Sequence, residues 1–352
     1  MKEIELDAGV VKDLVARAYT NVTNNKLVPL SSLLGLELGK DGLTIRSFNG
    51  IESLAVKSAL AKADEDLEVT VNATILNSLV QKVTTKTIGL SITDKGLHVR
   101  ANGNYDLDIV MDNGKPLIVP HIEGIAYGNP ASVPVDGLQK AIKYGEVAIS
   151  KTSDVPFETG IYFGKDGYAM ASDEAKCAIL PVKLFDDNLI LRVSSLKLMA
   201  LLGGPEITFE HDGANFVAKG KDGIVAGSLL DGVDDFPRDT LLGFITLPDG
   251  EKVNYVTANK DALLSALDRL AIFISTQIDE VIVGVKGGTL TIATADGKAV
   301  ESIAVAGTGD TPSLHYLLTP LREELTAYDG AKLAIRFDAD GNKSYCKFGT
   351  VI

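Results

Sequence analysis

The sequence predicts an α+β fold of three similar domains, each made of two strand–helix–hairpin units. Two observations lead to this prediction: a glycine turn between alternating strands recurs three times, and a helical pattern lies before and after each copy. The length of 352 residues also exceeds what one ordinary core accommodates. Its 45% hydrophobic and 23% charged residues are typical of a folded protein in water.

The repeat is clearest at its turns. The segment Gly39-Lys40-Asp41-Gly42-Leu43 recurs 125 positions later as Gly164-Lys165-Asp166-Gly167-Tyr168, and a looser copy begins at Gly287-Gly288. After each copy we expect an alternating strand and then a small polar turn, at residues 46–49, 171–174 and 293–296. Residues 40–46 are also echoed by residues 94–100, so a shorter period runs within the first copy. The repeats therefore predict six related units, paired into three domains.

Apolar residues at helical spacing flank the three copies. They predict helices over residues 10–22, 135–144 and 260–275 before the copies, and over 73–83, 194–202 and 316–325 after them. Proline and glycine interrupt the pattern over residues 112–134 and 237–251, which we interpret as linkers. We therefore expect domains at residues 1–127, 128–247 and 248–352.

The charge is unevenly placed along the chain. The net charge of −13 excludes a protein that binds nucleic acid over its whole surface, but not one that concentrates positive charge in one place. The predicted helices and their ends carry ten basic residues against six acidic ones. Such helices suit water-mediated contact with phosphates, although they are equally typical of solvated amphipathic faces. The ten basic residues are Lys12, Arg17, Lys82, Lys86, Lys140, Lys143, Lys197, Lys260, Arg269 and Arg322.

No catalytic constellation is evident in the sequence. Neither the phosphate loop Gly-x-x-x-x-Gly-Lys-Ser/Thr nor the zinc motif His-Glu-x-x-His occurs. Residues 194–197 match Ser-x-x-Lys without a companion motif, and residues 338–342 are interpreted as a hairpin turn rather than a calcium loop. We therefore expect no enzyme activity, no metal and no cofactor. The four histidines lie singly, at His98, His121, His211 and His315.

The chain also lacks the features of secreted or membrane proteins. Cys177 and Cys346 lie far apart without metal-ligand spacing, so we expect two reduced thiols. No stretch approaches the roughly 18–20 apolar residues of a membrane helix, and residues 1–7 lack the apolar core of a signal peptide. We therefore expect a cytoplasmic protein with no membrane partner.

Four ordered segments carry a resemblance to a known family. Residues 229–237 resemble a Leu-Ile-x-Gly-x-Phe-Pro segment, and residues 263–275 with the strand at 281–285 are similar to the opening of a third domain. Residues 170–173 stand in place of a Val-Ala-Thr-Asp segment, and residues 316–318 in place of a Tyr-Val-Leu helix start. Together they resemble the bacterial β sliding clamps, the processivity subunits of DNA polymerase III, over nearly the whole chain.

The resemblance implies a head-to-tail dimeric ring of clamp domains, with helices lining the hole and sheets outside. Its partners would be double-stranded DNA without sequence preference, a replicative DNA polymerase, a clamp-loader ATPase and a second copy of the chain. The subunit interface would join Tyr105 and Leu107 to Ile272 and Phe273. The helical stripe before Ile272 already suffices for a core, so we expect one or two of its last apolar residues to point outward; a fully buried helix end is the alternative.

The resemblance also implies an apolar pocket for a partner peptide. This chain departs from the family there, because residues 173–177 read Asp-Glu-Ala-Lys-Cys where Asp-Gly-His-Arg-Leu is usual, and it stops before the usual C-terminal strand and tail. We therefore expect an altered pocket that serves a divergent polymerase, as on a phage or plasmid. The pocket residues are Ser172, Glu174, Lys176, Cys177, Pro237, Leu241, Leu242, Ile278 and Tyr316.

Two other functions remain open from the sequence. One is a non-catalytic structural or assembly protein that uses the clamp repeat without encircling DNA. The other is an enzyme whose site is assembled at a domain junction and contains no recognisable motif.

Overall fold

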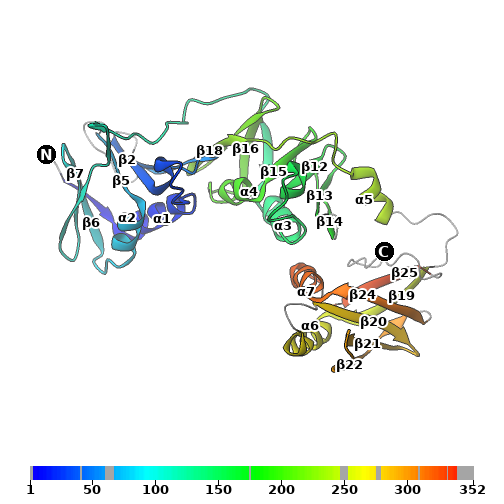
Figure 1. Cartoon of the computed structure of the whole chain (residues 1–352). Coiled ribbons are helices and arrows are strands. Elements are labelled where there is room, and N and C mark those ends of the chain that lie inside the picture. The colour runs from blue at the N-terminus through cyan, green and yellow to red at the C-terminus, as the bar shows by residue number, and fades with distance from the viewer. Residues whose placement is uncertain are drawn as a thin grey trace. The chain divides into compact units, whose positions relative to one another are not determined.

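The structure, a computed structural model, describes residues 3–39, 42–59, 67–173, 176–245, 253–274, 279–307, 310–330 and 332–338 (Figure 1). The chain divides into two compact units, and the division runs through the middle third of the sequence. Unit 1 contains Met1–Ile142, Gly160–Ala169 and Pro181–Val233, and unit 2 contains Lys143–Thr159, Met170–Leu180 and Asp234–Ile352.

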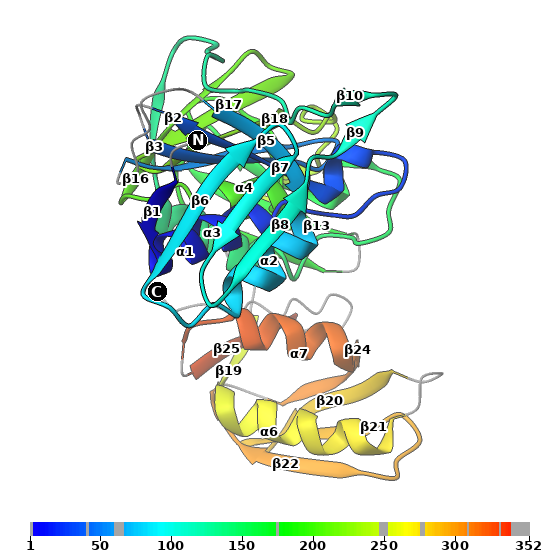
Figure 2. The same ribbon diagram turned by 90° about the vertical axis from the view of Figure 1, so that its left-hand side faces the viewer.

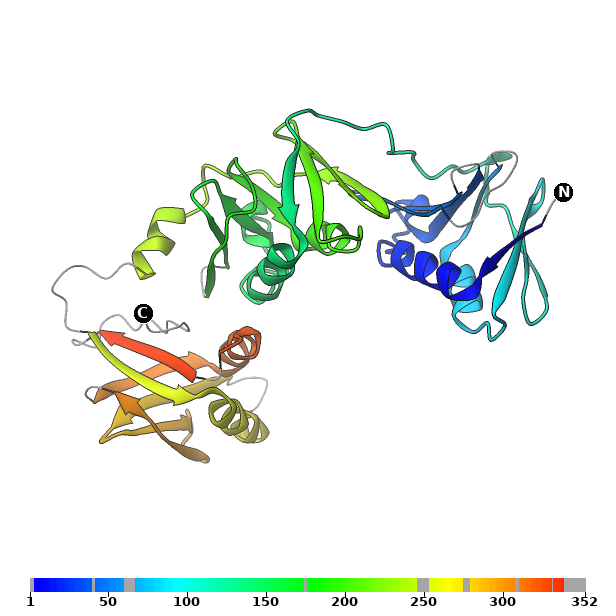
Figure 3. The same ribbon diagram turned by 180° about the vertical axis from the view of Figure 1, so that it is seen from behind.

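The beginning of unit 1 pairs two helices over a four-stranded sheet of order β1-β6-β7-β8 (Figure 3). Helix α1 (Ala8–Tyr19) follows β1 (Ile4–Asp7) directly, because the Asp7 carboxylate accepts hydrogen bonds from the amides of Gly9 and Val10. Helix α2 (Ala73–Gln81) starts in the same way after β5 (Leu67–Asn72), where Asn72 accepts from Ile75. The remaining strands are β6 (Thr87–Thr93), β7 (Gly96–Arg100) and β8 (Asn104–Asp108).

An eight-stranded sheet of order β11-β16-β17-β18-β4-β3-β2-β5 extends through unit 1. Its two halves meet where β18 pairs antiparallel with β4, from Gly223 opposite Val56 to Ala226 opposite Ser53. Main-chain hydrogen bonds therefore join segments that are about 170 positions apart in sequence. Its strands besides β5 are β2 (Leu33–Gly39), β3 (Gly42–Phe48), β4 (Ser53–Ser58), β11 (Ala131–Pro134), β16 (Glu206–His211), β17 (Asn215–Gly220) and β18 (Gly223–Ser228).

The middle third adds a four-stranded sheet of order β14-β13-β12-β15 and two helices. Aromatic side chains in unit 1 form a packed row, in which Phe185 lies 5.0 Å from Phe163 and 4.7 Å from Phe209 between ring centroids. The elements are α3 (Val135–Gly145), β12 (Gly160–Gly164), β13 (Tyr168–Ser172), β14 (Cys177–Pro181), β15 (Leu189–Arg192) and α4 (Val193–Met199).

The C-terminal part of unit 2 has two helices, α6 (Lys260–Leu270) and α7 (Leu318–Ala327), beside two sheets (Figure 2). Their apolar faces share one core with the strands, in which Leu267 and Leu325 are fully buried with Val281 and Ile292. The sheets have the orders β22-β21-β20-β24 and β23-β19-β25. The strands are β19 (Val253–Asn259), β20 (Glu280–Lys286), β21 (Thr289–Thr294), β22 (Val300–Ala304), β23 (Ala306–Gly307), β24 (Thr311–Leu317) and β25 (Lys332–Asp338).

The α+β class, the six helices and the glycine hairpins predicted from the sequence are confirmed within the described residues. Gly42, at the β2–β3 turn, has a φ of 121°, and a Cβ there would lie 2.0 Å from the carbonyl oxygen of Ser58, so the position requires glycine. The domain boundaries at residues 127 and 247 stay predictions.

Several details of the sequence prediction are wrong. The polar turn predicted at residues 46–49 begins only at Asn49, because Arg46 is a buried residue of β3. The last helix begins at Leu318 rather than Tyr316, since Tyr316 pairs with Val281 in β24. The turns predicted at 171–174 and 293–296 likewise start inside β13 and β21.

The predicted linkers also contain regular structure. Helix α5 (Arg238–Ile245) lies in the linker predicted at 237–251. The short strands β9 (Met111–Asp112) and β10 (Lys115–Pro116), and β11, lie in the linker predicted at 112–134. Cys346 and most of the turn at 338–342 lie outside the described residues.

Candidate nucleic-acid interface and partner site

The ten basic residues proposed from the sequence lie on or beside the helices. Eight are within α1, α3, α4, α6 and α7, Lys82 is the C-cap of α2, and Lys86 follows shortly after it. Lys12, Arg17 and Lys260 are half-buried, and the other seven are exposed. The helices thus present cations to solvent, as expected for either a phosphate-facing surface or a solvated face.

Intramolecular ion pairs occupy half of these cations. Five pair with a carboxylate that lies on the same helix or close to it in space. Exposed pairs of this kind reduce the local positive potential, while each contributes little to stability. The pairs are Arg17–Asp13 at 3.3 Å, Lys140–Asp136 at 4.0 Å, Lys143–Asp329, Arg269–Glu301 at 2.7 Å and Arg322–Asp268 at 2.6 Å.

Other cations bind carbonyl groups at helix ends. The ammonium of Lys12 donates to the carbonyl oxygen of Val83 at 2.6 Å, and that of Lys260 donates to Tyr328. Arg17 also donates to the carbonyl oxygen of Leu201 at 2.6 Å. Lys12 and Arg17 therefore have structural roles beyond any contact with nucleic acid.

The helices differ in net charge from one part of the chain to the next. Within their observed bounds, α1 carries two basic residues and one acidic residue, and α2 carries no charged residue. Helices α6 and α7 together carry three basic and four acidic residues. Helix α3 carries two basic residues and one acidic residue, and α4 carries one basic residue. Positive charge is therefore spread over α1, α3 and α4, whereas α6 and α7 together are net negative.

Part of the candidate partner site is assembled in unit 2 around the start of β14. The buried hydroxyl of Ser172 donates to the carbonyl oxygen of Lys176 at 3.1 Å, and the amide of Lys176 donates to Asp173 at 3.0 Å. The ammonium of Lys176 lies 3.4 Å from the carboxylate of Glu323 in α7 and 3.9 Å from that of Asp173. The turn before β14 and helix α7 are thus joined by charge-assisted contacts.

Two half-buried groups of this site have raised pKa values. Burial raises the pKa of the Cys177 thiol to about 11, with the charges of Glu324 and Asp173 adding to the effect. Burial also raises the pKa of Glu324 to about 7, although Lys176 opposes the rise while Asp173 and Glu323 add to it. The thiol therefore stays protonated at neutral pH, and the carboxyl group of Glu324 titrates closer to neutrality than an ordinary glutamate.

The acidic residues of α7 were missed as part of this site. In the sequence, Glu323 and Glu324 counted only as solvated charges of a helix, because nothing in their spacing relates them to residues 150 positions earlier. The adjacent Arg322-Glu323-Glu324 run was the only available signal.

The remaining pocket residues have varied surroundings. Leu241 is buried in α5, Leu242 is half-buried beside it, and Pro237 is exposed just before the helix. Tyr316 is half-buried on β24. Glu174 and Ile278 lie outside the described residues.

The candidate subunit-interface residues lie at two sheet edges or next to them. Strand β8 is the edge of one four-stranded sheet and β22 the edge of another. Ile272 and Phe273, in a 3-10 turn after α6, are 78% and 55% exposed, which excludes a fully buried helix end. Tyr105 is half-buried, whereas Leu107 is only 7% exposed and has little surface left to offer.

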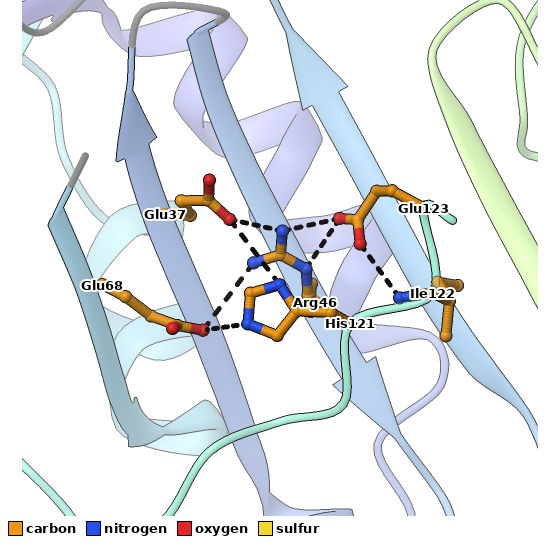
Figure 4. Close-up of polar contacts among 6 residues, drawn as sticks. All are labelled: Glu37, Arg46, Glu68, His121, Ile122 and Glu123. Carbon is orange, nitrogen blue, oxygen red and sulfur yellow. Dashed lines mark hydrogen bonds and ion pairs between the residues drawn. The ribbon is translucent and has the colours of Figure 1, made fainter. Parts of the chain in front are cut away.

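The first linker is fixed to the eight-stranded sheet by a charged cluster (Figure 4). The Arg46 side chain, 4% exposed, donates through Nε to Glu123 at 2.7 Å and also contacts Glu37 and, at 3.8 Å, Glu68. His121, from the linker, lies 3.1 Å from Glu68. Burial alone would raise the pKa of Glu123, but hydrogen bonds from Arg46 and from backbone amides hold it below its usual value.

A second polar cluster links the turn between β3 and β4 to α4 within unit 1. The carboxylate of Glu52, 1% exposed, accepts from the hydroxyls of Ser194 at 2.7 Å and Ser195 at 2.8 Å. Its other oxygen accepts from the Asn49 amide at 2.6 Å. Helix α4 has no N-cap side-chain hydrogen bond of its own, so Glu52 supplies negative charge at its N-terminus.

Within the described residues, no group of three or more His, Cys, Asp or Glu side chains is arranged to hold a metal ion. No helix in that part of the chain is long and apolar enough to cross a membrane.

Comparison with solved structures defines the class of fold. Over nearly the whole chain, the structure matches the β sliding clamps of bacterial DNA polymerase III, at low sequence identity. The Borrelia burgdorferi subunit matches with a TM-score of 0.82 at 15% identity, over 96% of this chain and 93% of that one. The Pseudomonas aeruginosa subunit matches with a TM-score of 0.79 at 17% identity, over 97% and 94%. No model of a known protein family matches the sequence, and no curated protein matches it.

Proposed function

We propose that this protein is a DNA sliding clamp, which encircles duplex DNA and tethers a replicative polymerase to it. The observation that carries the proposal is the clamp fold, matched over 96–97% of the chain. A clamp performs no chemistry, and it needs neither metal nor cofactor. Its three domains would be residues 1–127, 128–247 and 248–352, and it would act in the cytoplasm.

A closed ring stays on DNA by topology rather than by affinity. The helices support this mode of action, because five of the ten candidate DNA-facing cations are already paired with carboxylates. Weak, water-mediated contact with phosphates allows a ring to slide, whereas strong ionic contacts would hold it in one place.

Ring closure requires a second copy of the chain. The edge strands β8 and β22 each leave one row of backbone groups unpaired within the described structure, and such edges invite pairing with another strand. Ile272 and Phe273 provide exposed apolar surface that a partner subunit would cover. We assign the head-to-tail interface to these two edges and to Tyr105, Leu107, Ile272 and Phe273.

The polymerase and the loader ATPase would bind near β14, α5, α7 and β24. Lys176 and Cys177 lie there beside Glu323 and Glu324, a charged arrangement that accompanies the unusual Asp-Glu-Ala-Lys-Cys sequence. A pocket of this character supports a dedicated partner, so the clamp would serve a divergent polymerase of its own. Micromolar binding of a consensus clamp-binding peptide would contradict that assignment.

Retention on circular DNA tests the proposed function. Protein loaded on nicked circles should co-elute with them in gel filtration and should be lost when the circles are linearised. The variant I272D/F273D should abolish retention, since charge at these positions opposes subunit contact. Met111→Asp is the control, because Met111 is similarly exposed, at 52%, on the β9–β10 hairpin.

The alternative is an assembly protein that does not encircle DNA. The net negative charge of α6 and α7 favours it, because these helices offer no net attraction to phosphates. Equal elution from circular and linear DNA, with stable dimers in solution, would establish this alternative.

A further inference from the structure

A stretch of the first linker covers the place where the two halves of the eight-stranded sheet meet. We call residues 119–128 the strap, and the pairing of β4 with β18 the seam. Ile122 of the strap is 3% exposed and packs in one cluster with Ala55 of β4. The same cluster contains Val217 of β17 and Ala226 of β18. The strap therefore packs on both halves of the sheet at once.

The strap and the helices lie on opposite faces of the sheet. Across the seam, Ala55 stands opposite Ile224, which also packs against the cluster of Ile122. Because side chains alternate along a strand, Leu54 and Val225 point to the other face. In Figures 1 and 3, α1 and α4 cover that other face, whereas the blue-green chain that includes the strap crosses the first one. The seam is thus covered on both sides.

The seam itself is short. Its register contains four residue pairs, and the amide of Lys57 adds one hydrogen bond to the carbonyl oxygen of Asp222 at 2.9 Å. A pairing of this length depends on packing over its faces, since a few backbone hydrogen bonds contribute little net stability. On the helix side, Arg17 links the halves by donating to the carbonyl oxygen of Leu201, which follows α4. On the opposite side, the strap supplies the packing.

Charged groups anchor the strap to both halves of the sheet. On the first half, Arg46 donates through Nε to Glu123 of the strap at 2.7 Å (Figure 4). On the second half, the carboxylate of Glu210 in β16 accepts from the amides of Tyr127 at 2.8 Å and Gly128 at 3.0 Å. These two hydrogen bonds lower the pKa of Glu210 from its ordinary value. Each half thus contributes one charged group that holds the strap.

Detachment of the strap would uncover several groups together. Arg46 is 4% exposed, and without Glu123 its Nε would lose its acceptor. Departure of Ile122 would expose the apolar side chains of Ala55 and Ala226 to water. Because a buried donor without its partner and newly exposed apolar surface both cost free energy, we expect the strap to open as one unit.

We propose that the strap fastens the seam, so that the two halves of the sheet move as one body while the strap is attached and hinge about the seam when it is released. The first linker is then a conformational lock within unit 1 rather than a simple connection. This inference goes beyond the proposed function, and it holds whether or not the protein encircles DNA.

Proteolysis and hydrogen exchange of the full chain test the proposal. H121A/E123A removes two strap side chains of the Arg46 cluster, and because these are 50% and 38% exposed, the variant should fold. We expect chymotrypsin to cleave after Tyr127 at least about tenfold faster than in the wild type, because cleavage follows the population in which the strap is open. Amide exchange in β4 and β18, followed by mass spectrometry, should accelerate at least about fivefold. Exchange in β20 and β21 should not change.

A matched control removes the same two residue types elsewhere. E280A/H315A lies in the C-terminal part of unit 2, where the His315 ring is 2.7 Å from the Glu280 carboxylate. It should leave cleavage after Tyr127 and exchange at the seam within about twofold of the wild type. Glu123→Gln keeps an acceptor for Arg46 but not the charge, so both rates should rise less than in H121A/E123A.

The outcomes distinguish anchoring from fastening. Faster cleavage with unchanged exchange in β4 and β18 would overturn the fastening of the seam. Unchanged cleavage and exchange would overturn the anchoring of the strap by the Arg46 cluster. Retention on circular DNA is measured separately, so a failure of the clamp function would leave this proposal standing.

Discussion

Replacing Glu52 with alanine should destabilise unit 1 strongly. The carboxylate is 1% exposed and accepts three side-chain hydrogen bonds, from Asn49, Ser194 and Ser195. A hydrogen bond to a charged group contributes roughly 1.5–3 kcal/mol, and a buried donor left without its partner costs about 1–3 kcal/mol. Since the serines can rotate toward other acceptors, we expect a net loss of about 3–5 kcal/mol.

Chemical denaturation measures this loss. The chain contains no tryptophan, so unfolding in urea is best followed by far-ultraviolet circular dichroism. Glu52→Gln should cost about half as much, because its amide oxygen still accepts from the serines but its NH2 group faces the Asn49 amide. Asp94→Ala, at an exposed turn, is the control and should change stability by at most about 0.5 kcal/mol. A loss below about 1 kcal/mol for Glu52→Ala would refute the reasoning.

Three further predictions concern single positions. Gly42→Val should lower the free energy of unfolding by about 2 kcal/mol or more, because Gly42 has a φ of 121° and a Cβ there would clash with the carbonyl oxygen of Ser58. Gly114→Val is the control: Gly114 has a φ of 76° but no atom near its Cβ position, so the loss in the same urea titration should be smaller. Glu324→Gln should raise the melting temperature at pH 8 but not at pH 4. The pKa of Glu324 in the folded protein is about 7 against an ordinary 4.5, so the folded state loses stability as the pH rises from about 4.5 to above 7. An equal change of melting temperature at pH 4 and pH 8 would contradict this. Cys177, with a pKa of about 11, should react with iodoacetamide at pH 7.5 at least about tenfold more slowly in the folded protein than in urea, as peptide mapping would show; equal rates would contradict its burial.

Much of the local structure follows from the sequence, because helix and hairpin signals are local. Asp7 and Asn72 stand directly before the two helices that they cap, and Gly42 and Gly96 mark turns where a Cβ would clash with a carbonyl oxygen. The short apolar run Ile224-Val225-Ala226 of β18 is typical of a strand, but it does not show that β4 is its partner. Pairing between distant strands depends on the whole fold, and no local pattern encodes it.

The candidate sites were harder to predict from the sequence, because their contacts also join segments that are far apart in the chain. The repeat predicts a polar turn at residues 46–49, whereas Arg46 is buried in β3, and its partners Glu37, Glu68 and Glu123 come from three separate segments. The sequence identifies the basic residues of the helices, but it does not show which of them form ion pairs with carboxylates. Arg269 and Lys86 look alike in the sequence, yet Arg269 is paired with Glu301 and Lys86 is exposed without an ion pair among the described residues.

The pairing of β18 with β4 has a consequence for how far the sequence can diverge. The register from Gly223 opposite Val56 to Ala226 opposite Ser53 is maintained by amide and carbonyl groups, which every residue except proline supplies in full. Mutation can therefore replace side chains along these two strands while the bonds between them persist, except at Gly223, where a Cβ would lie 2.5 Å from the carbonyl oxygen of Ala55. A seam of this kind is compatible with a shared architecture at only 15–17% identity.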